Sequence, residues 1–198
     1  MKVYTYNDKV LVNSANDKWL KAAETIDYNP LGLAAGTFRL QVNTDSWQGA
    51  QTATLVPGTT NVYDVQNFMS STNWNKTSLV KVLGANTEGV TSVYMLFSNC
   101  SNLTETALFD TSSVTDFKAM FNNCSSLTSI PNFPTDSATQ CNAAFNATVN
   151  VESGALNMYQ KLSSRISDVS KYAGCFYNCG SNTTTGAAEL AQIPSDWK

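Results

Sequence analysis

The acidic residues are the side chains of this sequence with the most potential for catalysis, because histidine is absent. The 198 residues include 15 Asp and Glu and no His. Without His, Ser-His-Asp and Cys-His nucleophilic systems and the usual zinc sites are excluded. A glycoside hydrolase needs only two carboxylates, and Asp110, Asp116 and Asp136 are its candidates. Charged residues on repeats are more often solvated, so we predict no catalytic residue, no metal site and no cofactor.

Four aromatic residues have no obvious place in a core: Trp47, Trp74, Trp197 and Tyr94. Of these, Tyr94, Trp74 and Trp47 are the candidates for ligand binding. An exposed ring beside amide side chains can stack on a sugar face while the amides bond its hydroxyl groups. The alternative is that such rings cover the ends of the core. Tyr94 lies at a variable repeat position and is the best single candidate for an outward ring.

The five cysteines do not resemble a disulfide framework. Their number is odd and no CxxC occurs, which argues against both a set of bridges and a metal knuckle. We expect reduced, buried thiols that pack as small hydrophobic groups. A bridge between Cys175 and Cys179 is the main alternative.

A repeat of 24 residues positions most of these side chains. Residues 90–104 and 114–128 align without a gap at that offset, and the period continues to Phe145 and, after an insertion, to Phe176. Equivalent positions of neighbouring coils stack in the interior of a solenoid. The predicted core ladder is Phe97, Phe121, Phe145, Phe176, Cys100, Cys124, Cys179, Leu103 and Leu127.

Each unit shows a pattern of one helix and one strand. Val114, Phe117, Met120 and Phe121 have the spacing of one face of a short helix. A strand-like run follows between residues 127 and 130, and residues 154–165 read as a helix that holds the insertion. The sequence therefore predicts an α/β fold, a short leucine-rich-repeat-like solenoid of about four coils with a C-terminal cap, over residues 66–198.

The repeat resembles the BspA-like leucine-rich repeats of bacterial surface proteins, which also occur in virion proteins of phages of gut bacteria. Residues 109–115 and 120–128 carry the likeness. The third unit departs from it, with Ala144-Phe145 in place of Met-Phe and Thr148 in place of Cys. The resemblance implies a right-handed solenoid with an adhesive or structural role and no catalytic residues.

Residues 1–65 lack the period and predict a β-rich module with one short helix. Strands are expected at 3–6 and 9–12 around an Asn7-Asp8 turn, and at 37–42, 52–56 and 61–65. Residues 16–24 read as a helix that begins at Asn16. We expect this module to pack on the first coil and cap it, with attachment to another protein as the alternative.

The charge and the hydropathy of the sequence argue against several classes of function. The net charge of −3 and pI near 4.8 argue against nucleic-acid binding. No apolar stretch approaches the roughly 20 residues of a membrane span, and the start lacks the apolar region of a signal peptide.

These observations lead to a hypothesis of a non-enzymatic, adhesin-like binding protein. It would be extracellular, on a virion or a bacterial surface, and would contact a cell-surface glycan or protein. Assembly into a phage particle would place it there without a signal peptide. A purely structural phage tail-fibre or decoration component, in contact with other virion proteins, is the alternative. A glycoside hydrolase is less favoured, and a homo-oligomer is left open.

Overall fold

The structure is a computed structural model that describes residues 26–43, 53–59, 61–70 and 76–198, and three short strands before them. Its strands are β1 (Tyr4–Tyr6), β2 (Lys9–Leu11), β3 (Trp19–Lys21), β4 (Phe38–Val42), β5 (Ala53–Leu55), β6 (Val62–Val65), β7 (Leu79–Ala85) and β8 (Glu105–Thr106). Its helices are α1 (Ala155–Ser163) and α2 (Thr184–Gln192), with 3-10 turns η1 (Phe68–Ser70), η2 (Lys76–Ser78), η3 (Val169–Lys171) and η4 (Ser195–Trp197).

The first three strands form a small antiparallel sheet. Tyr6 pairs with Lys9, which confirms the predicted hairpin around residues 7 and 8. The helix predicted over residues 16–24 is wrong at Trp19–Lys21, which form β3 and pair with β2, Leu20 opposite Val10. Pairing with β2 satisfies backbone groups of this stretch and overrides the helix propensity of Leu20 and Lys21.

A second sheet has the strand order β5-β6-β4-β7-β8. The strands expected at 37–42, 52–56 and 61–65 are confirmed as β4, β5 and β6. Phe38, Leu40 and Val42 alternate into the core from β4, as expected for a strand with one buried face. Because β4 pairs with both β6 and β7, one sheet joins the two sides of the domain boundary expected at residue 65.

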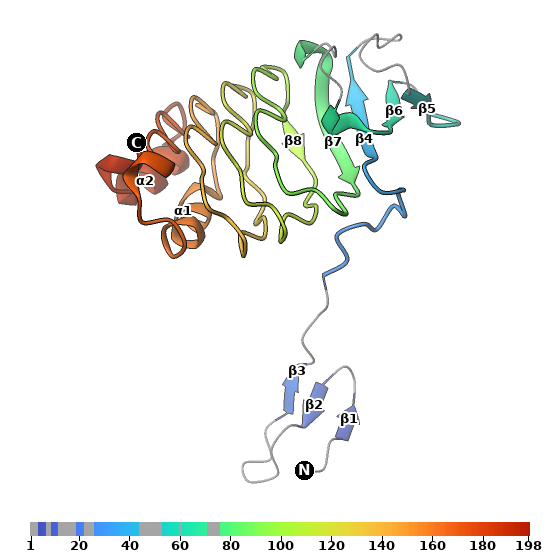
Figure 1. Cartoon of the computed structure of the whole chain (residues 1–198), viewed down its shortest axis with the longest axis horizontal. Coiled ribbons are helices and arrows are strands. Elements are labelled where there is room, and N and C mark those ends of the chain that lie inside the picture. Colours follow the sequence, from blue (N-terminus) through green and yellow to red (C-terminus); the bar gives the residue numbers. More distant parts are fainter. Residues whose placement is uncertain are drawn as a thin grey trace.

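From β7 onward the chain runs in successive coils that stack along one axis, and we call residues 79–182 the coil stack (Figure 1). Neighbouring coils pair in parallel, Val82 with Thr106 and Asp116 with Gln140. The Phe97 N–H donates to Met120 O at 2.8 Å, and the Phe121 N–H donates to Ala144 O at 2.8 Å. The sequence offset of 24 is therefore the offset between residues that lie side by side in adjacent coils.

One edge of each coil consists of consecutive reverse turns, and we call it the turn edge. The Cys100 N–H donates to Phe97 O at 3.0 Å, and Asn99, the third residue of this turn, has a φ of 67°. The equivalent residues of the next two coils, Asn123 and Ala147, have φ values of 59° and 56°. A positive φ at the third position is the mark of a type II turn, for which Gly and Asn are the usual residues.

These turns replace the short helix predicted in each unit, so that prediction is wrong. Val114, Phe117, Met120 and Phe121 are buried as expected, but the chain between them runs in turns. Ala119 has a φ of 54°, which a right-handed helix cannot contain. Stacked turns produce the same spacing of buried positions because each turn also advances by about three residues.

The Phe column forms the centre of the coil stack. The ring centroids lie 5.3 Å apart for Phe97 and Phe121, 5.9 Å for Phe121 and Phe145, and 5.3 Å for Phe145 and Phe176. All four rings are fully buried, as are the other members of the predicted ladder, Cys100, Cys124, Cys179, Leu103 and Leu127. In the third unit Thr148 takes the Cys position, and its hydroxyl donates to Phe145 O at 2.7 Å.

All five cysteines are free and buried, so Cys175 and Cys179 are not joined. Burial raises the pKa of the Cys100 and Cys175 thiols, and in each case a thiol of the adjacent coil, Cys124 or Cys141, raises it further. Burial also raises the pKa of Cys179, to about 12. These thiols therefore act as packing groups of low reactivity.

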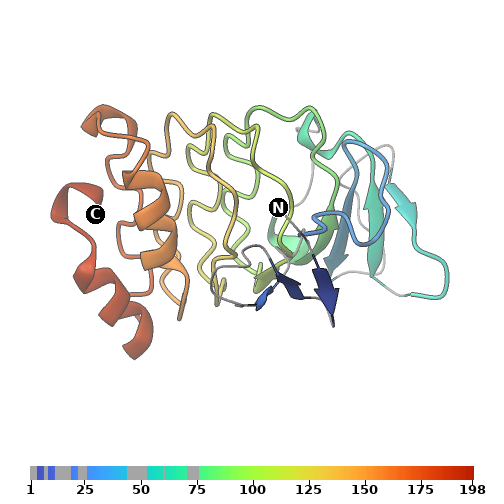
Figure 2. The ribbon, with the colours of Figure 1, turned by 90° about the horizontal axis from the view of Figure 1, so that it is seen from below.

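The two ends of the coil stack are covered differently. At the first coil, the Phe38 ring of β4 lies 6.2 Å from Phe97. At the far end α1, which confirms the helix predicted over 154–165, lies beside the C-terminal segment (Figure 2). Trp197 stacks on Tyr172 at 4.0 Å, and the Phe176 N–H donates to Trp197 O. In the part of the chain that the structure describes, no helix has the length and apolarity to cross a bilayer.

Candidate functional site

Tyr94, the best predicted ligand-binding ring, lies on the turn edge of the first full coil. Its side chain is 51% exposed, and Lys118 Nζ lies 5.7 Å from the ring centroid. The ammonium group therefore occupies one face of the ring through a cation–π contact. Trp47 and Trp74 lie outside the residues that the structure describes.

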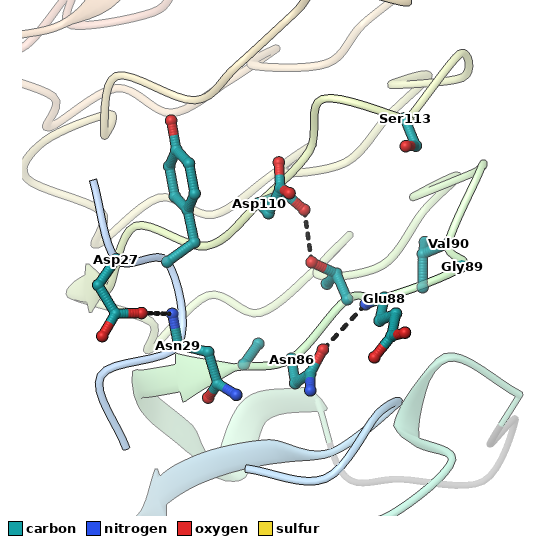
Figure 3. A pocket seen from close by; sticks show the side chains of 11 residues that line it. Asp27, Asn29, Asn86, Glu88, Gly89, Val90, Asp110 and Ser113 are labelled. Carbon is teal, nitrogen blue, oxygen red and sulfur yellow. Dashed lines mark hydrogen bonds between the residues drawn. The ribbon is translucent and has the colours of Figure 1, made fainter. Parts of the chain in front are cut away.

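A hollow lies elsewhere, where the segment before β4 meets the coil stack. The first cavity has a volume of about 370 Å³ and is shown in Figure 3. Its lining is mostly polar and consists of Asp27, Tyr28, Asn29, Ala85, Asn86, Thr87, Glu88, Gly89, Val90, Asp110 and Ser113. Three segments far apart in the sequence therefore meet at one cavity.

Local hydrogen bonds hold the polar side chains of this cavity in place (Figure 3). Asn86 Oδ1 accepts from the Glu88 N–H at 3.0 Å. Asp110 Oδ1 accepts from the Ser112 N–H at 2.9 Å. Asn and Asp at such corners bond the backbone two residues on. Asp27 does the same with the Asn29 N–H. The carboxylates of Asp27 and Asp110 are thus oriented by their own turns before any ligand binds.

Buried threonines fix the spacing of the coils along this edge. The Thr87 hydroxyl donates to Asp110 O, and the Thr111 hydroxyl donates to Pro134 O at 2.6 Å. Each bond joins one coil to the equivalent corner of the next. The corners that carry Asn86, Asp110 and Pro134 therefore form a column along the coil stack.

A second cavity, of about 270 Å³, adjoins the first at Tyr28, which lines both. Its lining is Ile26, Tyr28, Asn132, Pro134, Thr135, Asp136, Lys161, Ser164 and Arg165. We call the two cavities together the edge groove. Asn86 attaches the segment that contains Tyr28 to the coil stack, because the Asn86 Nδ2 donates to Leu33 O at 2.8 Å.

The two cavities differ in charge. Asp27, Glu88 and Asp110 line the first, which has no Lys or Arg in its lining. Lys161 and Arg165 line the second beside Asp136. Lys161 Nζ donates to Phe133 O at 2.7 Å, and burial lowers its pKa. The edge groove thus has an acidic end and a basic end.

The three carboxylates considered for glycoside hydrolysis are distributed over different places. Asp110 lines the first cavity and Asp136 the second. Asp116 lines neither, and its Oδ1 accepts from the Lys118 N–H at 2.9 Å. Among the described residues no group of three or more Cys, Asp or Glu side chains is arranged to hold a metal ion.

Sequence reasoning singled out Asp110 and Asp136 but missed the other residues that build the edge groove, Tyr28 above all. Residues 26–29 belong to the part without the repeat, and no pattern there indicates that they cross the coil edge. A partial signal existed, because Asn86 and Asp110 occupy the same repeat position and both begin a turn.

Comparisons with curated proteins and with solved structures gave no match. One family model does match, over residues 51–158, and its description is "Mycoplasma protein of unknown function, DUF285". The matched stretch includes both aligned repeat segments and the coil corners with Asn86, Asp110 and Asp136. Because the model covers more than half of the chain, this protein belongs to the DUF285 family.

Proposed function

We propose that this chain is a non-enzymatic binding protein of a virion or bacterial surface that contacts a cell-surface glycan or protein through the edge groove. We also propose that its coil stack is a short leucine-rich-repeat-like solenoid. The family match overlaps the residues that resemble BspA-like surface repeats, and this overlap supports a surface-associated role.

The observation that carries the proposal is the position of Tyr28 between two polar cavities. A ring offers a flat apolar face, and the oriented Asn and Asp side chains around it offer hydrogen-bonding groups. Concave sites with one apolar platform and a few fixed polar groups are typical of ligand binding. The turns and the buried threonines already hold these groups. Binding would therefore cost little side-chain conformational entropy.

A binding role fits the carboxylates better than hydrolysis does. A glycosidase needs two carboxyl groups on either side of one scissile bond. Asp110 and Asp136 line separate cavities on successive coils, and both are exposed. They suit hydrogen bonds with ligand hydroxyl groups.

The test is glycan-array binding of the full chain and of three variants that each remove one ring. Tyr28→Ala removes the ring shared by the two cavities and is expected to abolish binding. Tyr177→Ala is the control, because this ring is 52% exposed and lines neither cavity. Tyr94→Ala tests the turn edge.

The outcomes separate the hypotheses. Loss of binding in Tyr94→Ala but not in Tyr28→Ala would move the site to the turn edge and refute the edge groove. An array without signal, together with co-purification of the wild-type chain with intact particles, would favour the purely structural role.

A further inference from the structure

We propose that the ligand of the edge groove is a glycan that ends in an acidic sugar, of the sialic or uronic acid type. This inference rests on the proposed function and specifies it. In this arrangement the sugar carboxylate lies in the second cavity at Arg165 and Lys161, the ring packs on Tyr28, and the hydroxyl groups reach the carboxylates of the first cavity.

The basic end has the donors that a carboxylate requires. Arg165 Nη2 lies 3.5 Å from Asp136 Oδ1, and their side chains are 49% and 69% exposed. A close charge-assisted bond is about 2.7–2.9 Å long, so this pair is loose and a ligand carboxylate can reach the guanidinium group. Lys161 Nζ donates to Phe133 O and Asn132 O, which uses two of the three donors of an ammonium group.

The charge balance fixes the direction in which the ligand lies. The second cavity holds two cations, Lys161 and Arg165, against the single carboxylate of Asp136. The first cavity holds three carboxylates and no cation in its lining. A ligand carboxylate is therefore attracted to the second cavity and repelled from the first.

The acidic end suits hydroxyl groups. An ionised carboxylate only accepts hydrogen bonds, and Asp110 and Asp27 each use one oxygen to accept a bond from their own turn. Their other oxygens, with the exposed Glu88, form a set of acceptors for neighbouring sugar hydroxyls. One molecule that carries both a carboxylate and several hydroxyl groups matches both ends, and an acidic sugar is such a molecule.

The experiment compares binding of sialyllactose and of lactose, which lacks the acidic sugar, by the full-length chain. The wild-type chain is expected to prefer sialyllactose, and added salt is expected to reduce that preference. Arg165→Gln should weaken sialyllactose binding by about tenfold, the worth of one charge-assisted contact. Asp136→Asn should strengthen it, because it removes the competing carboxylate. Arg165→Gln should weaken lactose binding less than sialyllactose binding, because lactose carries no carboxylate to pair with the guanidinium group.

Lys171→Gln is the matched control, because it removes the same charge from an exposed residue that lines neither cavity. Circular dichroism verifies that each variant is folded. Equal binding of the two sugars, lost in Tyr28→Ala, would overturn the acidic-sugar inference and leave the proposed function intact. Binding of acidic peptides without any glycan would overturn it too, and would favour a protein ligand. Binding of neither sugar would overturn the acidic-sugar inference, and a glycan array without signal would refute the glycan-binding role as well.

Discussion

Gly186 in α2 is the position where local propensity and tertiary packing predict opposite effects of one substitution. Gly is about 1 kcal/mol less favourable than Ala inside a helix, so Gly186→Ala would stabilise an isolated α2. In the protein, a Cβ atom at residue 186 would lie 2.0 Å from Val151 O and 2.7 Å from the Gly180 Cα. Both are backbone atoms and cannot rotate away.

The steric cost exceeds the gain in propensity. Overpacking costs about 1–3 kcal/mol. The added Cβ would also lie 2.6 Å from Thr183 Oγ1, the atom that caps α2 by accepting from the Gly186 N–H at 3.0 Å. Loss of that cap costs about 1 kcal/mol more. We therefore expect Gly186→Ala to lower the free energy of unfolding by about 2 kcal/mol.

The displaced helix should also affect α1. Glu189 of α2 accepts from the Leu156 N–H at 3.0 Å, and Gly154 provides no side-chain cap of its own to α1. If α2 shifts, the first turn of α1 loses this carboxylate, which is favourable at a helix N-terminus.

Denaturant unfolding followed by circular dichroism measures the effect, with Ala188→Gly as the control. Ala188 is exposed in the same helix. Its substitution by Gly changes the helix propensity without a steric clash and should lower the free energy of unfolding by about 1 kcal/mol. In thermal unfolding of this chain of 198 residues, the melting temperature of Gly186→Ala should fall by about 4–8 °C. A Gly186→Ala chain as stable as the wild type, or more so, would refute the reasoning.

Three further predictions test the coil stack. Phe121→Ala removes an interior ring of the Phe column and should lower the free energy of unfolding by about 3–5 kcal/mol in urea titrations; an effect below about 1 kcal/mol would contradict its burial. Ala119→Gly should raise stability by about 0.5 kcal/mol, because its φ of 54° strains an L-residue. Ala173 has no positive φ, so Ala173→Gly should lower stability. Stability changes of the same sign in the two variants would contradict the turn geometry. The native chain should resist iodoacetamide near neutral pH, since Cys179 is buried and its pKa is raised to about 12; five alkylated thiols before unfolding would contradict this.

The burial pattern of the repeat was readable from the sequence, but the backbone conformation was not. Val114, Phe117, Met120 and Phe121 are buried as predicted, although they lie on turns and not on a helix. Both conformations bring every third or fourth residue to one side. The choice depends on hydrogen bonds to another coil, such as that of the Ala119 N–H to Asn142 O at 2.9 Å.

The sequence by itself determined which side chains stack. In coils of equal length, residues separated by one repeat occupy the same position in adjacent coils. It also determined which chemistry is missing, since a chain without His lacks a whole class of catalysts. Only the tertiary structure decided where the groove lies. Tyr28 and Arg165 line the same cavity although 137 positions separate them in the sequence, and a contact of that range leaves no period or local motif by which to find it.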